Sequence, residues 1–187
     1  NIYGPLGMQT TGYRPLDRFP TERIAPTECD NFYRKQQLIG YVHDETACFF
    51  GGVQGNAGLF SNANDLAKLC QMWLNKGTYG NERILSPKTV ELFLTEKSST
   101  SRRGLGFDKP DMENPEKSPT AIEASASTIG HLGFTGTCFW IDPEQELIYI
   151  FLCNRVYPSR THDALSQLNI RPELFSTIYR SIKNHSK

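Results

Sequence analysis

The sequence has no excess of either charge. Its 187 residues hold 20 Lys and Arg against 20 Asp and Glu, which gives a formal net charge of +0 at pH 7. Proteins that bind the phosphate backbone of nucleic acids show a clustered excess of basic residues. The charge balance therefore argues against nucleic acid as a partner. With 38% hydrophobic and 21% charged residues, the composition is that of an ordinary globular chain of about one domain.

Long apolar runs are also missing. No stretch approaches the roughly 18 consecutive apolar residues of a membrane-spanning helix, and residues 1–25 contain no signal-peptide core. We therefore predict neither a membrane span nor an export signal within these residues. The chain opens at Asn1 rather than at Met, without a capping or turn motif, and we expect it to be cut from a longer protein.

Cysteine and histidine are present but are not spaced as a metal site. The five cysteines form no C-x-x-C pair, and no two of the four histidines lie three or four positions apart. We predict no metal and no other cofactor. The cysteines are expected to be free thiols that pack as small hydrophobic side chains.

The common motifs of a serine nucleophile are absent too. The sequence has no G-x-S-x-G, and no serine is followed three positions later by lysine, as S-x-x-K requires. Tyr79-Gly80-Asn81 matches the Y-x-N pattern that often accompanies S-x-x-K, but these residues favour a turn. His43-Asp44-Glu45 offers either a general base or ligand cluster, or a structural loop. Adjacent side chains point in different directions, which favours the structural loop.

Helices are the first clear feature that is present. Residues 1–60 are rich in turn formers, and we predict loops there with one short helix around 31–38. In 61–95, apolar residues recur with helical spacing from Leu66 to Leu74, with Ser61 as the predicted N-cap and Gly77 as the stop. A second helix of this segment is predicted to open at Ser86 and Pro87 and to bury Val90, Phe93 and Leu94.

Two further segments complete this part of the prediction. Residues 96–128 are polar and contain prolines, which predicts a mobile surface connection around a short apolar piece, Leu105–Phe107. A final helix over 170–184 is predicted to start near Pro172 and to pack through one apolar side, made of Leu174, Phe175, Ile178 and Ile182.

The strongest strand pattern lies in 129–155. Thr137–Ile141 and Leu147–Asn154 are apolar runs joined by a polar segment with proline, which predicts an antiparallel hairpin. If Phe139 pairs near Ile150, neither face of the hairpin is polar, because side chains alternate between faces. A sheet that is apolar on both faces needs a cover on each. The predicted fold class is therefore α+β, an antiparallel sheet with helices on both faces.

A glycine-rich segment, Gly130–Thr137, leads into this hairpin. Its three glycines allow the backbone to approach a ligand closely and to present N–H groups, as one half of an oxyanion hole does. The same residues are typical of a bulge or bend at a sheet edge, and the residues alone favour this structural interpretation. Both interpretations remain open on the residues alone.

An ordered series of motifs resembles the C-terminal half of the serine β-lactamase and penicillin-binding-protein superfamily, on the class C and esterase side. Within it, the sequence is most similar to modules that follow a family 3 glycoside hydrolase of β-N-acetylglucosaminidase type in bacterial envelope proteins. The motifs are Pro5-Leu6-Gly7-Met8, Gly40-Tyr41-Val42-His43-Asp44, Gly55-Asn56-Ala57-Gly58-Leu59-Phe60-Ser61, Gly104-Leu105-Gly106-Phe107, His131-Leu132-Gly133-Phe134-Thr135-Gly136 and Leu152-Cys153-Asn154-Arg155.

The resemblance implies a substrate-binding and oxyanion role for His131, Leu132, Gly133, Phe134 and Thr135. His131 takes the place of the family's Lys or His, Gly133 that of its Gly, and Phe134 would lend its backbone N–H. Leu132 replaces the usual Thr and offers no hydroxyl to a substrate carboxylate. Arg160 is either a contact for such a carboxylate or an exposed surface arginine.

The resemblance also implies what lies elsewhere. Residues 1–187 would be the C-terminal part of one β-lactamase-like domain, incomplete without its N-terminal part, with residues 1–60 as loops at the cleft. The catalytic Ser, Lys and Tyr are expected upstream of Asn1, so the isolated chain should be inactive. The parent protein would hydrolyse an ester, amide or peptidoglycan-type substrate through an acyl-enzyme in the bacterial periplasm or cell envelope.

Two expectations concern partners. Relatives of the family often carry Thr and His where this sequence has Leu132 and Asn56. These differences also allow a non-catalytic module that binds cell wall or accompanies a β-N-acetylglucosaminidase. An apolar sheet face or edge left exposed would be covered by the missing N-terminal half of the domain, or by a second copy in a homodimer.

Overall fold

A three-stranded antiparallel sheet forms the centre of the computed structural model, which describes residues 1–95 and 98–185. The strand order is β5-β6-β7, so β6 is central. Phe139 pairs with Ile150, which confirms the predicted hairpin and its register, and His131 pairs with Phe139 on the other side. The three strands are β5 (Ile129–Leu132), β6 (Cys138–Asp142) and β7 (Leu147–Phe151).

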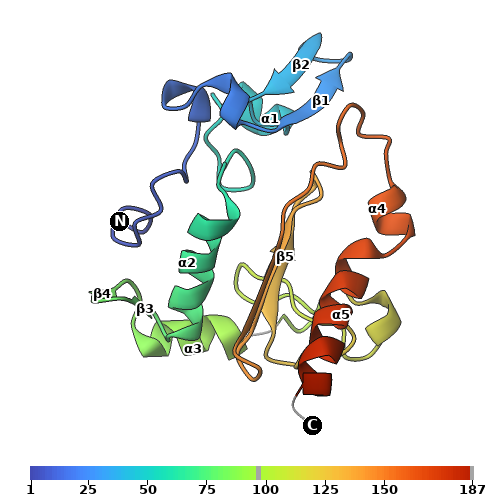
Figure 1. Ribbon diagram of the computed structural model, residues 1–187. Helices are drawn as coiled ribbons and strands as arrows, with labels where there is room; N and C mark the ends of the chain where they lie inside the picture. The colour runs from blue at the N-terminus through green and yellow to red at the C-terminus, as the bar shows by residue number, and fades with distance from the viewer. Residues whose placement is uncertain (96–97, 186–187) are drawn as a thin grey trace.

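Each face of this sheet is covered by a helix, α2 (Ala63–Leu74) on one and α5 (Ile170–His185) on the other (Figure 1). On the α2 side, Cys70 packs with Ile129 and Ile141 of the sheet. On the α5 side, the rings of Tyr149 and Phe175 are stacked, with centroids 4.5 Å apart. The α+β class, with both faces of the sheet covered, is confirmed.

The ends of the two helices in 61–95 follow local hydrogen bonds. Asn62, rather than the predicted Ser61, is the N-cap of α2, because its side chain accepts from the Asp65 N–H at 2.8 Å while the Ser61 hydroxyl bonds that of Thr11. Helix α3 (Pro87–Thr95) opens as predicted: the Thr89 N–H donates to the Ser86 hydroxyl at 3.0 Å, and Val90 is buried.

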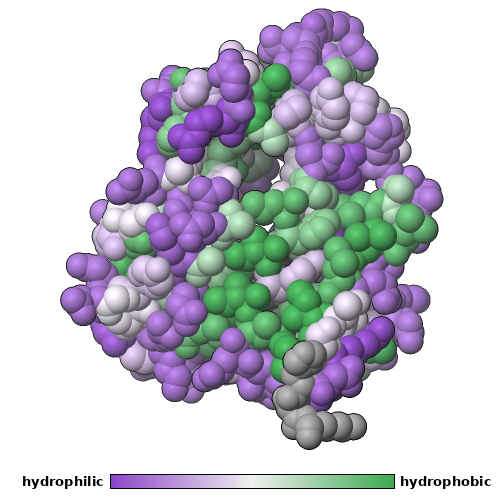
Figure 2. Space-filling model, viewed as in Figure 1, coloured by the Kyte–Doolittle hydropathy of each residue, from purple (hydrophilic) through white to green (hydrophobic). Residues whose placement is uncertain are grey.

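Helix α5 begins at Ile170, two residues before Pro172, and its buried face differs from the prediction. Of the four residues on the predicted side, only Phe175 is buried. The other buried residues of the helix are Ser176 and Tyr179, which the pattern did not predict. The reason is that Phe175 and Tyr179, one turn apart, fill the space over Trp140 and Tyr149. The stripe of Leu174, Ile178 and Ile182 is therefore left exposed at 44%, 36% and 46%. Figure 2 shows apolar surface gathered over the sheet and the helices α4 and α5 on this side of the molecule.

The N-terminal region contains a small two-stranded sheet, β1 (Pro26–Asp30) and β2 (Gln36–Ile39), instead of the predicted helix at 31–38. The Asp30 carboxylate accepts the backbone N–H groups of Phe32, Tyr33 and Arg34 at 3.0, 2.8 and 3.1 Å. This local bonding stabilises a turn in place of a helix.

The remaining elements are short. Gly80 and Asn81 form the predicted turn, which joins Tyr79 at the end of β3 (Thr78–Tyr79) to β4 (Glu82–Arg83). The bounds are η1 (Pro15–Asp17), η2 (Thr21–Arg23), α1 (Glu45–Phe49), β3 (Thr78–Tyr79), β4 (Glu82–Arg83), η3 (Pro115–Lys117) and α4 (Ala164–Gln167).

The connection predicted over 96–128 is not wholly on the surface. Thr120, Ala121 and Thr128 are almost fully buried, and Ala121 and Ala124 pack into the core cluster beneath α5. Both alanines belong to the same buried cluster as Trp140 and Phe175. Residues 96 and 97 of this connection lie outside the described residues.

All five cysteines are free, and burial raises the pKa of the Cys70 and Cys138 thiols to about 12. Among the residues described, no helix combines the length and apolar character needed to cross a bilayer.

Candidate functional site

The glycine-rich segment forms the tight turn between β5 and β6. The Gly133 N–H donates to the Thr137 carbonyl at 2.7 Å, and the Gly136 N–H donates to the Gly133 carbonyl at 3.0 Å. A Cβ atom at Gly133 would lie 2.4 Å from the Thr137 hydroxyl oxygen. A larger residue at this position would force the Thr137 side chain to move, whereas Gly136, with a φ of 113°, has a backbone conformation that strains any residue with a side chain.

Phe134 lies at the tip of this turn. Within residues 1–95 and 98–185, its backbone N–H has no hydrogen-bond acceptor. Its carbonyl accepts from Arg155 Nε at 2.9 Å, and its ring lies 4.6 Å from the Arg155 guanidinium and 5.4 Å from the His43 ring. The carbonyl and the ring of Phe134 thus hold the turn in place, while the Phe134 N–H remains available as a donor.

The neighbouring residues of the predicted site divide between the two faces of the sheet. Leu132 packs against the core cluster beneath α5, which explains how a leucine is tolerated in this place. His131 lies opposite Phe139, which packs on the α2 side. The Thr135 carbonyl accepts from the Arg155 N–H at 2.9 Å and so helps to fix the turn.

His131 has a defined tautomer because of its two partners. Its Nδ1 lies 2.8 Å from the Leu132 carbonyl oxygen, which can only accept, so Nδ1 carries the hydrogen. Its Nε2 lies 2.9 Å from Nη1 of Arg103, which can only donate, so Nε2 is the acceptor. The imidazole is therefore the Nδ1–H tautomer and hydrogen-bonds a cation on its outer nitrogen.

Arg103 is a residue of this site that the sequence analysis missed. It lies 28 positions from His131, in the loop before Phe107. The two segments meet because Asp108 and Gly130 exchange both backbone hydrogen bonds, at 2.8 and 3.1 Å. The adjacent pair Arg102-Arg103, just before the Gly104–Phe107 motif, was the available signal, but no local pattern predicts that bridge.

Asp108 distinguishes the two neighbouring arginines. Its carboxylate is buried and pairs with both ends of Arg102, Nε to Oδ1 at 2.8 Å and Nη2 to Oδ2 at 2.9 Å. Nη2 of Arg103 is 3.7 Å from the same carboxylate, and the Arg103 side chain is 53% exposed. The charge of Asp108 is matched by Arg102, so Arg103 adds an unmatched positive charge beside His131.

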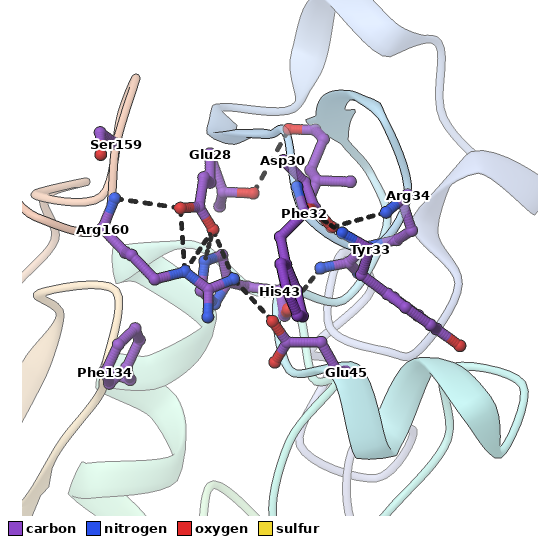
Figure 3. Close-up of polar contacts among 12 residues, drawn as sticks. Glu28, Asp30, Phe32, Tyr33, Arg34, His43, Glu45, Phe134, Ser159 and Arg160 are labelled. Atoms are coloured by element: carbon purple, nitrogen blue, oxygen red, sulfur yellow. Dashed lines mark hydrogen bonds and ion pairs between the residues drawn. The ribbon is translucent and has the colours of Figure 1, made fainter.

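A second charged cluster joins the N-terminal region to the loop after β7 (Figure 3). Glu28 is buried on β1 and accepts from Arg160 Nε at 2.9 and 2.7 Å, and its Oε2 lies 2.9 Å from His43 Nε2. Arg160 Nη2 also donates to Glu45 at 2.6 Å. The hydrogen bond from Arg160 lowers the pKa of Glu28 and outweighs the opposing effect of burial. We call Glu28, His43, Glu45 and Arg160 the Glu28 cluster.

The Glu28 cluster revises the expectation for Arg160. This residue is not an exposed surface arginine, since its side chain is only 36% exposed and binds two carboxylates of the protein itself. Its contact with a substrate carboxylate stays a prediction, but its charge is already matched. A pocket of about 400 Å³ lies beside it, lined by residues 28–32 and 158–160.

The triplet His43-Asp44-Glu45 serves three different partners. His43 bonds Glu28, Asp44 caps α1 by accepting from the Ala47 N–H at 2.7 Å, and Glu45 binds Arg160. This divergence fits the structural interpretation of the triplet. In the part of the chain that the structure describes, no group of three or more His, Cys, Asp or Glu side chains could hold a metal ion.

Comparison with known proteins places this geometry in context. The family model described as Beta-lactamase matches residues 1–170. Proteins named "Putative D-alanyl-D-alanine carboxypeptidase" from Salmonella paratyphi B and Salmonella newport are 36% identical in an alignment of 187 positions, which covers 93% of this chain and 42% of theirs. The chain thus spans less than half the length of these curated relatives.

A solved structure gives the same picture for the fold. A mutant of simvastatin synthase from Aspergillus terreus superposes with a TM-score of 0.60 at 16% identity, over 98% of this chain and 48% of that one. At this identity the likeness concerns the fold alone.

Proposed function

The chain belongs to the β-lactamase family, and on this premise we propose that it forms the oxyanion and substrate-binding part of a serine acyl-transfer hydrolase. The observation that carries the proposal is the Phe134 N–H, which has no acceptor among the described residues and lies two positions after the end of β5. A backbone donor at this point is suited to stabilise the oxyanion of an acyl-transfer intermediate. The loss of one such donor typically lowers kcat by about 10²–10³ fold.

The roles of the other residues follow from their contacts. Gly133 permits the tight reversal that presents the Phe134 N–H, and Arg155 holds the turn through two carbonyls. The nucleophilic Ser, the Lys that accepts its proton and the Tyr of the family would come from sequence outside these 187 residues. The reaction would transfer the acyl group to Ser and then to water.

We propose a peptidoglycan-type peptide ending in D-Ala-D-Ala as the substrate. Its support is the name of the relatives at 36% identity, "Putative D-alanyl-D-alanine carboxypeptidase". A protein with this substrate would act in the bacterial cell envelope or periplasm. The alternative of a non-catalytic accessory module has no support in these comparisons, and the association with a β-N-acetylglucosaminidase stays a prediction.

The experiment uses the protein as it is encoded, with any sequence that flanks these residues. Nitrocefin, p-nitrophenyl esters and N-acetyl-D-Ala-D-Ala would each be assayed for turnover. We expect hydrolysis of the D-Ala-D-Ala peptide or an ester, and none by the isolated 187-residue chain. Absence of turnover of every substrate by the encoded protein would refute the hydrolase proposal.

We further propose that the exposed stripe of α5 and the outer edge of β7 are covered by another segment of the same domain. The support is that β7 ends the sheet among the described strands, and that Leu174, Ile178 and Ile182 are exposed on α5, whose Phe175 stacks on Tyr149 of β7. Light scattering tests this on the encoded protein and on the isolated chain. We expect the encoded protein to be a monomer and the isolated chain to self-associate. A stable dimer of the encoded protein would instead indicate that a second copy covers this surface.

A further inference from the structure

We propose that Arg103 binds the carboxylate of an acidic substrate beside His131. This inference rests on the proposed function, because it names the group that recognises the charged end of the substrate. It assigns the carboxylate contact, for which Arg160 was one candidate from the sequence, to a residue of a different loop.

The first argument is the charge that each arginine already faces. Arg160 lies between Glu28 and Glu45, with ion-pair distances of 2.6 Å to each. Arg103 has no carboxylate at hydrogen-bond distance among the described residues, since Asp108 lies 3.7 Å away and is paired with Arg102. A ligand carboxylate at Arg160 would be a third negative charge beside one guanidinium that already binds two carboxylates. At Arg103 the ligand carboxylate would form an ion pair with a guanidinium that has no carboxylate at hydrogen-bond distance.

The second argument is the orientation of the guanidinium. His131 Nε2 accepts from Arg103 Nη1 at 2.9 Å, and His131 is itself fixed by the bond from its Nδ1 to the Leu132 carbonyl. In the described structure, His131 is the single hydrogen-bond partner of the guanidinium. The remaining donors form a planar fork that suits two-point binding of a carboxylate.

The third argument is the chemistry of the neighbouring strand. Leu132 supplies no hydroxyl, and its side chain packs into the core beneath α5. A carboxylate bound near the end of β5 therefore needs another donor. Arg103, 53% exposed and held against His131, is placed to supply it.

Kinetics on matched substrates test this inference. The encoded protein and its Arg103→Gln and Arg103→Lys variants would be assayed with N-acetyl-D-Ala-D-Ala, with the C-terminal amide of that peptide and with p-nitrophenyl acetate. We expect Arg103→Gln to lower kcat/KM for the free carboxylate about 10–100 fold, chiefly through KM, and to change the two neutral substrates less than about twofold. Arg103→Lys should recover part of the loss. Arg83→Gln, on the exposed β4 strand, is the matched control.

An equal loss on charged and neutral substrates, or no loss on the charged one, would overturn the inference. If the wild type turns over none of these compounds, the proposed function fails and a binding measurement decides the inference separately. The ring ¹⁵N resonances of His131 would be followed while N-acetyl-D-Ala-D-Ala is added. A saturable shift of Nε2 in the wild type that is absent in Arg103→Gln supports the inference, and the same response in both proteins, or in neither, overturns it.

Discussion

Arg160 and Arg103 both lie near the turn that carries Phe134, yet their surroundings differ. Arg160 is bound by two carboxylates, one of them buried, and it joins the β1–β2 region to the loop after β7. Arg103 contacts a histidine and an aspartate that is already paired. We infer that an arginine paired with carboxylates of the protein stabilises the fold, whereas an exposed arginine without such a partner remains available to a ligand. Variants of the Glu28 cluster and of the Arg103–His131 pair test this comparison in parallel.

The largest effect is expected for Glu28→Gln. The substitution keeps the size of the side chain but removes the negative charge that Arg160 and His43 share. Breaking a buried ion pair costs about 3–5 kcal/mol, and because Arg160 is 36% exposed we expect a loss of about 2–3 kcal/mol in the free energy of unfolding. Urea denaturation measures it, with Glu22→Gln on η2 as an exposed control. A loss below about 0.5 kcal/mol in the free energy of unfolding would contradict a structural role of the Glu28 cluster.

A smaller loss is expected for Arg160→Gln, about 1–2 kcal/mol, because Glu28 keeps its bond to His43. The same variant should retain the preference for a carboxylate substrate over its amide. Denaturation and the substrate pair of the Arg103 experiment measure both properties. A loss of that preference would return the carboxylate contact to Arg160 and contradict the comparison.

The pH dependence of stability should also separate the wild type from Glu28→Gln. The pKa of Glu28 is lowered from its ordinary value of 4.5, first by the hydrogen bond from Arg160. The unfolded state then binds the proton more readily, so the stability from Glu28 is fully present above pH 4.5 and is lost as the pH falls through the lower folded pKa. The difference in unfolding free energy between the two proteins should therefore shrink below pH 4.5. A difference that stays constant from pH 7 to pH 3 would contradict this assignment.

The smallest effect on stability is expected for Arg103→Gln. The side chain is 53% exposed and its hydrogen bond to His131 is near the surface, so the unfolding free energy should change by no more than about 0.5 kcal/mol. Urea denaturation beside Arg160→Gln gives the direct contrast. A loss in unfolding free energy equal to that of Arg160→Gln would show that Arg103 is structural. The two arginines would then not differ in role.

Local patterns predicted the elements in which neighbouring residues decide the conformation. The helix α2, the cap at Ser86 and the pairing of Phe139 with Ile150 each depend on spacing within one segment. The predictions failed where distant contacts compete with periodicity. The apolar stripe of α5 has the right spacing, but the aromatic contacts of Phe175 and Tyr179 with the sheet select a different face.

The same division holds for the candidate site. The residues alone indicated a bend in the glycine-rich segment from Gly133 to Gly136, because turn geometry depends on a few adjacent residues. The family resemblance added the roles expected of His131, which lies on β5 just before the turn, and of Phe134 within it. Only the tertiary structure decided which arginine faces His131 and which is bound by Glu28, since these contacts span 28 and 132 positions. Charge pairing depends on distance in space, and a chain brings such residues together only through the packing of its sheet and helices.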